Sequence, residues 1–308
     1  MRLSGRDYVS VDDLTPDEFW GLIDFARHLK ARSAAGDRPL LLAGKTLAMV
    51  FEKPSLRTRV SFEVGMFQLG GMAVYLGPQD IQLGVRESIP DAARNLERMA
   101  DGIMARTFAH ATVTGLAEGS GCPVVNGLSD LEHPCQALGD LLTVAERFPR
   151  LTEVKIAWVG DGNNVCHSLM LGAAKLGITM NVAAPPGYAP AEAIAARAQA
   201  IAGTTGATLT VGSDPAQAVA SADVVYTDVW ASMGQESQRE ERARIFRPYQ
   251  VNATLLARAT PTGVVMHCLP AHRGEEVTDD VLDGPRSIVY DQAENRLHAQ
   301  KALLAMIL

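Results

Sequence analysis

Apolar residues follow two spacings that alternate along the chain. Residues 45–52 form a short apolar run typical of a buried strand, whereas residues 55–71 carry apolar positions every three or four residues, as an amphipathic helix does. A second short apolar run follows at residues 72–77. A strand, a helix and a strand in this order predict a parallel βαβ unit.

The same alternation continues and then restarts in the second half of the chain. The further predicted elements are a helix at 87–100, strands at 101–108 and 122–128, a helix at 133–149, a second βαβ unit at 154–188, and strands at 222–230 and 263–270. This pattern predicts an α/β fold with two doubly wound parallel-sheet lobes and an active site in the cleft between them. We expect one domain at residues 1–133 and another at 134–290, with a final helix at 291–308 that packs back on the first.

The first predicted helix has a clear start signal. Thr15 is a suitable N-cap, Pro16 occupies the first helical position, and Glu18 completes a capping box. The apolar residues that follow share one helical face, which predicts packing against a core: Phe19, Leu22, Ile23, Ala26 and Leu29.

Composition limits the kind of protein further. The chain has 308 residues, 47% of them hydrophobic, and a formal net charge of −7, which argues against nucleic acid as a partner. Its four cysteines are widely spaced, without a Cys-x-x-Cys pair, as in proteins of a reducing compartment. No run of about 18 apolar residues and no apolar signal segment is present, so we expect a cytoplasmic protein without a membrane partner.

A cationic segment lies where the first predicted strand ends and the next helix begins. Ser55, Arg57 and Thr58 crowd the first turn of that helix, where free backbone N–H groups favour anions. The hydroxyls and a bidentate guanidinium predict a phosphate cradle. Arg59 has a simpler explanation, an ion pair with Glu63 one turn on. The P-loop pattern is missing, so ATP is not implied.

Other polar residues stand at the ends of later strands in the first half. Arg106 ends the strand at 101–108, a second cation on a strand's carboxyl edge. His133 precedes a helix and Gln136 lies one turn away. A neutral imidazole and a carboxamide at a helix start can hold a carbonyl oxygen, although a single histidine is more often structural.

Residues 158–164 suggest a dinucleotide site but lack the required pattern. Gly160 and Gly162 follow a strand and open a helix, yet the third glycine position is Val165. The next strand carries no acid for a ribose, so a dinucleotide is not expected. Asn163 and Asn164 could instead offer amides to a carboxylate.

Two further strand ends carry reactive side chains. Asp228 ends one strand and suits an ammonium group, although capping of the next turn is an equal alternative. Cys268 ends another strand; it is either a small buried hydrophobe or a contact for a reacting amine. Arg296 lies on the final helix, where a solvated charge is the simpler interpretation.

Taken together, these segments resemble the motifs of the ornithine carbamoyltransferases. The matching motifs are Ser55-x-Arg57-Thr58-Arg59, His133-Pro134-Cys135-Gln136, Asp228-x-x-x-Ser232-Met233-Gly234 and His267-Cys268-Leu269-Pro270. They occur in the family's order and spacing over nearly the whole chain. The last two point to ornithine rather than aspartate as the acceptor. Leu56 stands where many members carry threonine, at a position that contributes mainly its backbone.

The resemblance implies a role for each matching residue. It implies that Arg106, His133, Asp228 and Cys268 are catalytic. For carbamoyl phosphate it implies contacts from Ser55, Leu56, Arg57, Thr58, Gln82, Arg106, His133, Pro134, Cys135, Gln136, Cys268, Leu269 and Arg296. For ornithine it implies Asn164, Asp228, Ser232 and Met233. Gln82 resembles a residue given to a neighbouring subunit, which implies a homotrimer or a multiple of it.

The implied reaction is direct carbamoyl transfer to the δ-amine of L-ornithine, giving citrulline and phosphate in arginine biosynthesis. It requires no cofactor and no metal. Four alternatives stay open: carbamoylation of putrescine, carbamoylation of an N-acylated ornithine, a non-catalytic phosphate or amino-acid sensor, and an oxidoreductase. Putrescine lacks the α-carboxylate that Asn164 would bind, and an acylated ornithine would leave Asp228 without an ammonium partner.

Overall fold

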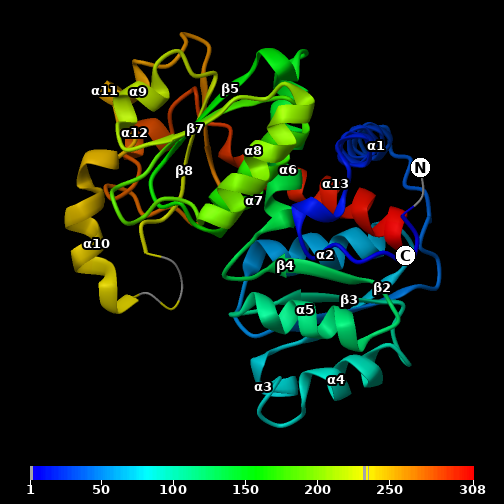
Figure 1. Cartoon of the computed structure of the whole chain (residues 1–308). Helices are drawn as coiled ribbons and strands as arrows, with labels where there is room; N and C mark the ends of the chain where they lie inside the picture. Colours follow the sequence, from blue (N-terminus) through cyan, green and yellow to red (C-terminus); the bar gives the residue numbers. More distant parts are fainter. Residues whose placement is uncertain (1–2, 232–233, 235) are drawn as a thin grey trace. The chain divides into compact units, whose positions relative to one another are not determined.

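The computed structural model describes residues 3–231, 234 and 236–308, and it divides into two compact units (Figure 1). Unit 1 comprises Met1–Leu142 and Glu294–Leu308, and unit 2 comprises Thr143–Ala293. Each unit has its own parallel sheet flanked by helices, which confirms the predicted α/β class. No helix among the described residues is both long and apolar enough to cross a membrane.

The sheet of unit 1 has four parallel strands in the order β2-β1-β3-β4. Their bounds are β1 Thr46–Phe51, β2 Met72–Leu76, β3 Gly102–Arg106 and β4 Val124–Leu128. The helices of this unit are α1 Pro16–Ala34, α2 Leu56–Gln68, α3 Pro78–Ile81, α4 Ile89–Leu96 and α5 His110–Gly119, after a short 3-10 turn, η1 Val11–Asp13. Strand β1 is buried from Leu47 to Phe51, as its continuous apolar run predicts.

The sheet of unit 2 has five parallel strands in the order β7-β6-β5-β8-β9. Their bounds are β5 Lys155–Val159, β6 Thr179–Ala183, β7 Leu209–Gly212, β8 Val224–Thr227 and β9 Val264–His267. The helices are α7 Asn164–Lys175, α8 Glu192–Thr205, α9 Pro215–Val219, α10 Arg239–Phe246, α11 Ala253–Leu256 and α12 Asp279–Leu282, with 3-10 turns η2 Leu151–Glu153, η3 Glu236–Gln238 and η4 Arg247–Tyr249.

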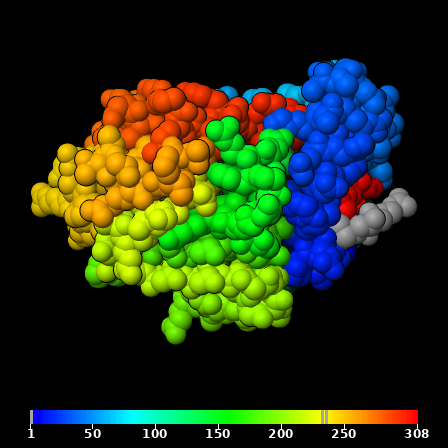
Figure 2. Space-filling view, turned by 90° about the horizontal axis from the view of Figure 1, so that it is seen from above, coloured from blue at the N-terminus to red at the C-terminus, as the bar shows by residue number. Residues whose placement is uncertain are grey.

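Two long helices, α6 Pro134–Arg147 and α13 Val289–Ile307, each contain residues of both units. The part of α13 from Glu294 onward belongs to unit 1, where the N–H of Leu3 donates to the carbonyl of Met306. Lys301 also donates to Ser33 of α1. Figure 2 shows red residues of the chain's end beside the blue N-terminal residues.

The predicted start signals of two helices of unit 1, α1 and α2, are present in the structure. Thr15 caps α1, and the Glu18 carboxylate accepts a hydrogen bond from the Thr15 N–H at 2.9 Å. The predicted capping box is therefore present. All five apolar residues of the predicted core face of α1 are buried. Ser55 caps α2 by accepting from the Thr58 N–H at 3.3 Å. Helices α5, α8 and α10 and strand β7 were not predicted from the sequence.

The strand order places a topological switch point in each sheet. In unit 1, β1 has its successor β2 on one side and β3 on the other, and Phe51 is in register with Arg106. In unit 2, β5 has β6 on one side and β8 on the other. Ligands of open α/β sheets bind at the carboxyl ends of strands where the order reverses. The segments that follow β1 and β3 therefore start at the switch point of unit 1, and those that follow β5 and β8 start at that of unit 2. All four segments carry predicted site residues.

Gly162 permits a close approach of two segments in unit 2. A Cβ atom there would lie 2.2 Å from the backbone nitrogen of Pro190. The N–H of Gly162 also donates to the carbonyl of Tyr188 at 2.8 Å. In dinucleotide sites the corresponding glycine admits a pyrophosphate, whereas here residues 188–190 occupy the approach.

We expect Gly162→Ala to destabilise the protein by about 1–3 kcal/mol, because backbone would have to move to admit the methyl group. Gly203→Ala is the matched control. Its Cβ would meet nothing within 4 Å, and at this exposed position of helix α8 alanine is favoured over glycine by about 0.5–1 kcal/mol. Calorimetric melting should show a lower midpoint for Gly162→Ala and an equal or higher one for Gly203→Ala. Equal midpoints for Gly162→Ala and the unmodified protein would contradict the packing argument.

Candidate active site

The phosphate cradle predicted after β1 is the N-terminus of α2 in the structure. Ser55 is the N-cap, and Leu56 begins the helix with a side chain that is 74% exposed. Arg57 follows in the first turn. The exposure of Leu56 fits a position at which the backbone N–H, rather than the side chain, meets a ligand. A 13-residue helix of this kind presents its partial positive charge at the place where β1 ends.

Thr58 links three distant parts of unit 1 at this helix start. Its Oγ1 accepts a hydrogen bond from Arg296 Nη2 at 2.9 Å and from Arg106 Nη1 at 3.5 Å. All three residues are buried, with exposed fractions of 0%, 3% and 7% for Thr58, Arg296 and Arg106. The structure thus brings together a helix start, a strand end and the last helix. Arg296 is not the solvated charge that its helix alone suggested.

Gly139 explains how Arg296 reaches this place. A Cβ at Gly139 would lie 3.0 Å from Cγ and 3.2 Å from Cα of Arg296. Helices α6 and α13 therefore pack closely at this pair, with the backbone and the Cγ of Arg296 against Gly139. This contact holds the base of the Arg296 side chain beside the first turns of α6.

Arg59 has a structural role, as the sequence indicated. Its Nε lies 3.0 Å from Glu63 Oε1, and its guanidinium stacks over the Tyr75 ring at 3.9 Å from the centroid. Glu63 lies on α2 and Tyr75 lies on β2, and neither is among the hydrogen-bond partners of the Thr58 hydroxyl. Arg59 therefore serves as a control for Arg57 in the experiments below.

His133 is a neutral imidazole in this cationic setting. It is 4% exposed, and burial together with the positive charges of Arg296 and Arg106 holds its pKa well below the usual range. Smaller effects of the same sign come from Lys53 and Arg57. A neutral ring can donate one hydrogen bond to a carbonyl oxygen without carrying charge at pH 7.

The residues that follow His133 form the first turn of α6. One of them, Cys135, packs into the interior, and another, Gln136, presents an acceptor oxygen. Pro134 begins the helix, and the thiol of the buried Cys135 lies 3.4 Å from the carbonyl of Asn126. Burial raises the pKa of Cys135 to about 12, so it stays a thiol that faces the interior. Gln136 is 1% exposed; its Nε2 donates to Asp140 at 2.8 Å, and among the described residues its Oε1 has no hydrogen-bond partner.

Lys53 belongs to this cluster, although the sequence motifs gave it no role. It is 9% exposed, and its Nζ lies 4.9 Å from the centroid of the Phe108 ring. Burial, followed by the charge of Arg106, lowers the pKa of Lys53 to about 8. The only sequence signal was its place two residues before Ser55, at the end of β1.

Gln82 adopts a left-handed backbone on an exposed segment of unit 1, with φ of 46°. Its carbonyl accepts backbone hydrogen bonds from the N–H groups of Val85 and Arg86 at 3.1 and 3.0 Å. A non-glycine residue in this conformation is strained, and such strain gathers at ligand contacts. Within unit 1, Gln82 is thus presented on a loop rather than joined to the Thr58 network.

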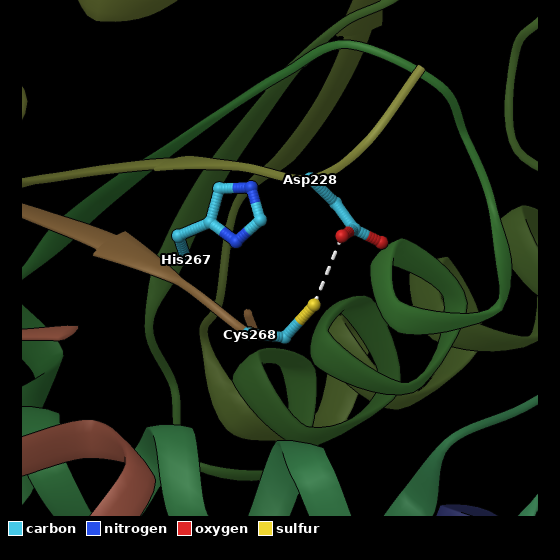
Figure 3. Close-up of side chains that lie close together, drawn as sticks. All are labelled: Asp228, His267 and Cys268. Atoms are coloured by element: carbon cyan, nitrogen blue, oxygen red, sulfur yellow. Dashed lines mark hydrogen bonds between the residues drawn. The ribbon is translucent and has the colours of Figure 1, made fainter. Parts of the chain in front are cut away.

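The second set of site residues lies at the switch point of unit 2. The thiol of Cys268 points at the carboxylate of Asp228, with Sγ 2.9 Å from Oδ1 (Figure 3). The other oxygen of Asp228 accepts from Asn163 Nδ2 at 2.8 Å. Asp228 is 6% exposed. Because β8 and β9 are neighbours in the parallel sheet, their carboxyl ends bring Asp228 and Cys268 together.

The start of α7 uses its two asparagines differently. Asn163 is the N-cap, and its Oδ1 accepts from the N–H groups of Val165 and Cys166 at 3.0 and 3.2 Å. With its amide on Asp228, Asn163 is committed to structure and is not available to a substrate carboxylate. Asn164, the first residue of α7, stays the candidate for that contact.

A buried histidine shapes the Cys268 segment. The N–H of Leu269 donates to His267 Nδ1 at 2.8 Å, so the ring proton is on Nε2, 3.1 Å from Glu276 Oε1. Leu269 has φ of 57° and precedes a cis peptide bond to Pro270. Among the described non-glycine residues, positive φ occurs at Gln82, Ser221 and Leu269, so two of the three are predicted site residues.

Asp228, His267 and Cys268 also offer ligand atoms within 4.8 Å of one another. Both ring nitrogens of His267 are engaged, however, one by the Leu269 N–H and the other by Glu276. A metal on these three residues would have to displace one of those bonds. We therefore assign the group a hydrogen-bonding role. The predicted ligands Ser232 and Met233 lie outside the described residues.

Comparison with known proteins matches both halves of the chain. Residues 6–146 match the family model for the aspartate/ornithine carbamoyltransferase carbamoyl-P binding domain, and residues 152–307 match that for the Asp/Orn binding domain. The chain belongs to the aspartate/ornithine carbamoyltransferase family. This agrees with a two-unit α/β protein that carries a cationic site in unit 1 and an acidic one in unit 2.

Similar proteins within the family share one name. An ornithine carbamoyltransferase of Pyrococcus abyssi is 55% identical over 308 residues, covering 100% of this chain and 97% of that protein. The solved ornithine carbamoyltransferase of Pyrococcus furiosus is 54% identical, with a TM-score of 0.97 over 100% of this chain and 98% of that one. The Giardia lamblia ornithine transcarbamoylase is 34% identical, with a TM-score of 0.89 over 98% and 97% of the chains.

We expect anion binding in unit 1 to depend on pH through Lys53. Its pKa of about 8 means that the cation is present below pH 8 and lost above it, so affinity for a dianion should fall between pH 7 and 9. Sulfate keeps its charge over this range, so its binding can be followed by calorimetry. Lys53→Met should bind sulfate weakly at every pH, and Lys53→Arg, which keeps the charge, should remove the pH dependence. An unchanged pH profile in Lys53→Met would exclude this role.

Proposed function

We propose that this protein is an ornithine carbamoyltransferase, which transfers the carbamoyl group of carbamoyl phosphate to the δ-amine of L-ornithine and releases citrulline and phosphate. The observation that carries the proposal is the buried network of Thr58, Arg106 and Arg296 beside a neutral His133. Phosphate and a carbonyl oxygen both need donors, and this network supplies them at a helix start. The family membership and the shared name of the relatives support the same activity.

Unit 1 is the proposed binding site for carbamoyl phosphate. The phosphate would lie at the N-terminus of α2, held by Ser55, Arg57, Thr58 and the backbone of Leu56, with Lys53 adding positive charge. The carbamoyl oxygen would accept from Arg106, His133 and Thr58. Gln136 Oε1, a buried acceptor with no partner among the described residues, is suited to the carbamoyl NH₂. Arg296, Pro134 and Cys135 complete this surface.

Unit 2 is the proposed binding site for ornithine. The Asp228 carboxylate would hold the α-ammonium group, together with Ser232, while Asn164 and the backbone of Met233 would hold the α-carboxylate. Asn163 and Cys268 already orient both oxygens of Asp228. Cys268 and the Leu269 carbonyl would contact the reacting amine and the carbamoyl group. A preset carboxylate of this kind costs little reorganisation when substrate binds.

The chemistry follows from these placements. The lone pair of the deprotonated δ-amine attacks the carbamoyl carbon, and the C=O electrons move to oxygen. The oxyanion is stabilised by the fixed donors of Arg106, His133 and Thr58, which can contribute several kcal/mol, about 3 for one such donor. The electrons then return, the C–O bond to phosphate breaks, and the phosphate leaves at the α2 N-terminus as an anion that takes up the extra proton of the attacking nitrogen. Much of the rate would come from the alignment of the two substrates.

The alternative functions fit the structure less well. A phosphate sensor would use the α2 start but has no need for a neutral His133 beside Arg106. An oxidoreductase would need space for a pyrophosphate at Gly162, where Pro190 lies instead. Putrescine would not use Asn164, and an N-acylated ornithine would not use Asp228.

We also propose that the protein forms a homotrimer in the cytoplasm and that Gln82 serves a neighbouring subunit. Strand β2 is an edge strand of its sheet. Large apolar side chains are exposed on α2, on β2 and near Gln82: Val60, Phe67, Met72, Val74 and Val85. A second copy of the chain would cover them and so remove apolar surface from water.

Purified protein should form citrulline from carbamoyl phosphate and L-ornithine, and none of the corresponding products from aspartate, putrescine or N-acetylornithine. Arg57→Ala should lower kcat/KM by about 100-fold, since a charge-assisted contact to phosphate is lost. Arg59→Ala, the matched control in the same helical turn, should stay within about threefold. Tight sulfate binding without turnover of any acceptor would favour a sensor.

Mixing two impaired variants should test the shared site. Each variant lacks one of the two residues that a shared site needs. In a hybrid trimer, a site that takes Arg57 from a Gln82→Ala subunit and Gln82 from an Arg57→Ala neighbour would have both residues intact. Activity should therefore reappear when the two variants are dissociated, mixed and reassembled. If mixing restores nothing while a mixture with unmodified subunits keeps activity, Gln82 acts within its own subunit or not at all.

A further inference from the structure

The carboxamide of Gln136 has a defined orientation because of what lies one turn further along α6. Its Nε2 is 2.8 Å from Asp140 Oδ1, and both side chains are buried, with exposed fractions of 1% and 0%. A carboxylate only accepts hydrogen bonds, so the group that faces Asp140 must be the NH₂ of Gln136. The carbonyl oxygen of Gln136 consequently faces the other way.

That oxygen, Oε1, is the unusual atom of the site. It is buried, and the structure gives it no hydrogen-bond partner among the described residues. An unsatisfied buried carbonyl is unfavourable, so within a binding site it marks a place where a donor of the ligand can be received. The neighbouring side chains present donors instead: Arg106 and Arg296 both donate to Thr58, and His133 is neutral with one ring N–H.

Those two kinds of group match the two ends of a carbamoyl group. The carbonyl oxygen of a carbamoyl group needs donors, and its NH₂ needs an acceptor. An acetyl group has the same shape and the same carbonyl but carries a methyl in place of the NH₂. Among the side chains of unit 1 that we assign to the carbamoyl group, Gln136 is the one whose acceptor oxygen can distinguish the NH₂ from the methyl.

We propose that Asp140 is a positioning residue that sets the specificity of the site for carbamoyl phosphate over acetyl phosphate, by fixing the Gln136 oxygen toward the acyl substituent. This inference rests on the proposed function, which places the carbamoyl group beside His133 and Gln136. Asp140 acts through Gln136 and does not touch the substrate.

The test compares the affinities of carbamoyl phosphate and acetyl phosphate, measured by calorimetry on the full-length protein. The unmodified protein should bind carbamoyl phosphate about tenfold more tightly, the size expected for one hydrogen bond. Asp140→Asn keeps the shape of the side chain, but its amide can donate as well as accept a hydrogen bond. The carboxamide of Gln136 can therefore flip, so that its oxygen no longer has one fixed direction. The preference should then fall to about twofold or less, through weaker carbamoyl phosphate binding, while acetyl phosphate affinity changes by less than about twofold.

Three comparisons separate positioning from general damage. Sulfate affinity should be unchanged in Asp140→Asn, because the phosphate contacts lie on α2. Gln136→Leu should lose the same preference, and Asp140→Asn combined with Gln136→Leu should lose no more than Gln136→Leu alone. If Asp140→Asn weakens sulfate, acetyl phosphate and carbamoyl phosphate equally, or leaves the preference intact, the proposal is wrong.

The outcomes also distinguish this inference from the proposed function. Citrulline formation with an unchanged preference in Asp140→Asn would overturn the role of Asp140 alone. A preference that disappears in Asp140→Asn, in a protein that makes no citrulline, would support the positioning role and overturn the proposed reaction.

Discussion

Buried positive charge is the constraint on which the rest of unit 1 depends. Lys53, Arg106 and Arg296 are each less than one-tenth exposed, and they lie close enough together to lower the pKa of His133 and, for Arg106, that of Lys53. Cations are costly to bury unless their surroundings compensate for the lost water. The Thr58 hydroxyl accepts from both guanidiniums, and the close packing at Gly139 holds α13 in the necessary place. Such an arrangement is suited to receive an anion, whose charge would complete the compensation.

Unit 2 has the same architecture and the opposite chemistry. Its switch point carries a carboxylate, Asp228, rather than cations. Asn163 and Cys268 each donate to one of its oxygens, so the carboxylate is fixed before any ligand binds. A second layer supports this one, since His267 is held by Glu276 and in turn accepts from the Leu269 backbone. Two parallel α/β sheets thus carry the proposed anion site and the proposed ammonium site with little change of fold.

The division of α6 between structure and function shows how closely the two are joined. Within its first two turns, Cys135 packs inward, Gln136 presents a buried oxygen, and Gly139 admits Arg296. Asp140 then fixes the amide of Gln136. A helix places residues three and four apart on one face, so His133, Gln136 and Asp140 fall into a row. One short segment therefore sets the polarity of the proposed carbamoyl site.

The sequence by itself determined what depends on local spacing. The continuous apolar runs of the strands, the 3.6-residue period of the helices, the caps at Thr15 and Ser55 and the Arg59–Glu63 pair follow from neighbours within a few residues. The strand-end positions of Arg106, Asp228 and Cys268 follow from where the apolar runs stop. Short or weakly patterned elements such as α5 and β7 were missed because their periodicity is slight. The tertiary structure alone decided that Arg296 donates a hydrogen bond to Thr58 and that Asn163 donates to Asp228 rather than to a substrate. It also decided that the pKa of Lys53 is lowered. Each of these depends on strand order and helix packing, which bring together residues whose separation along the chain carries no local signal.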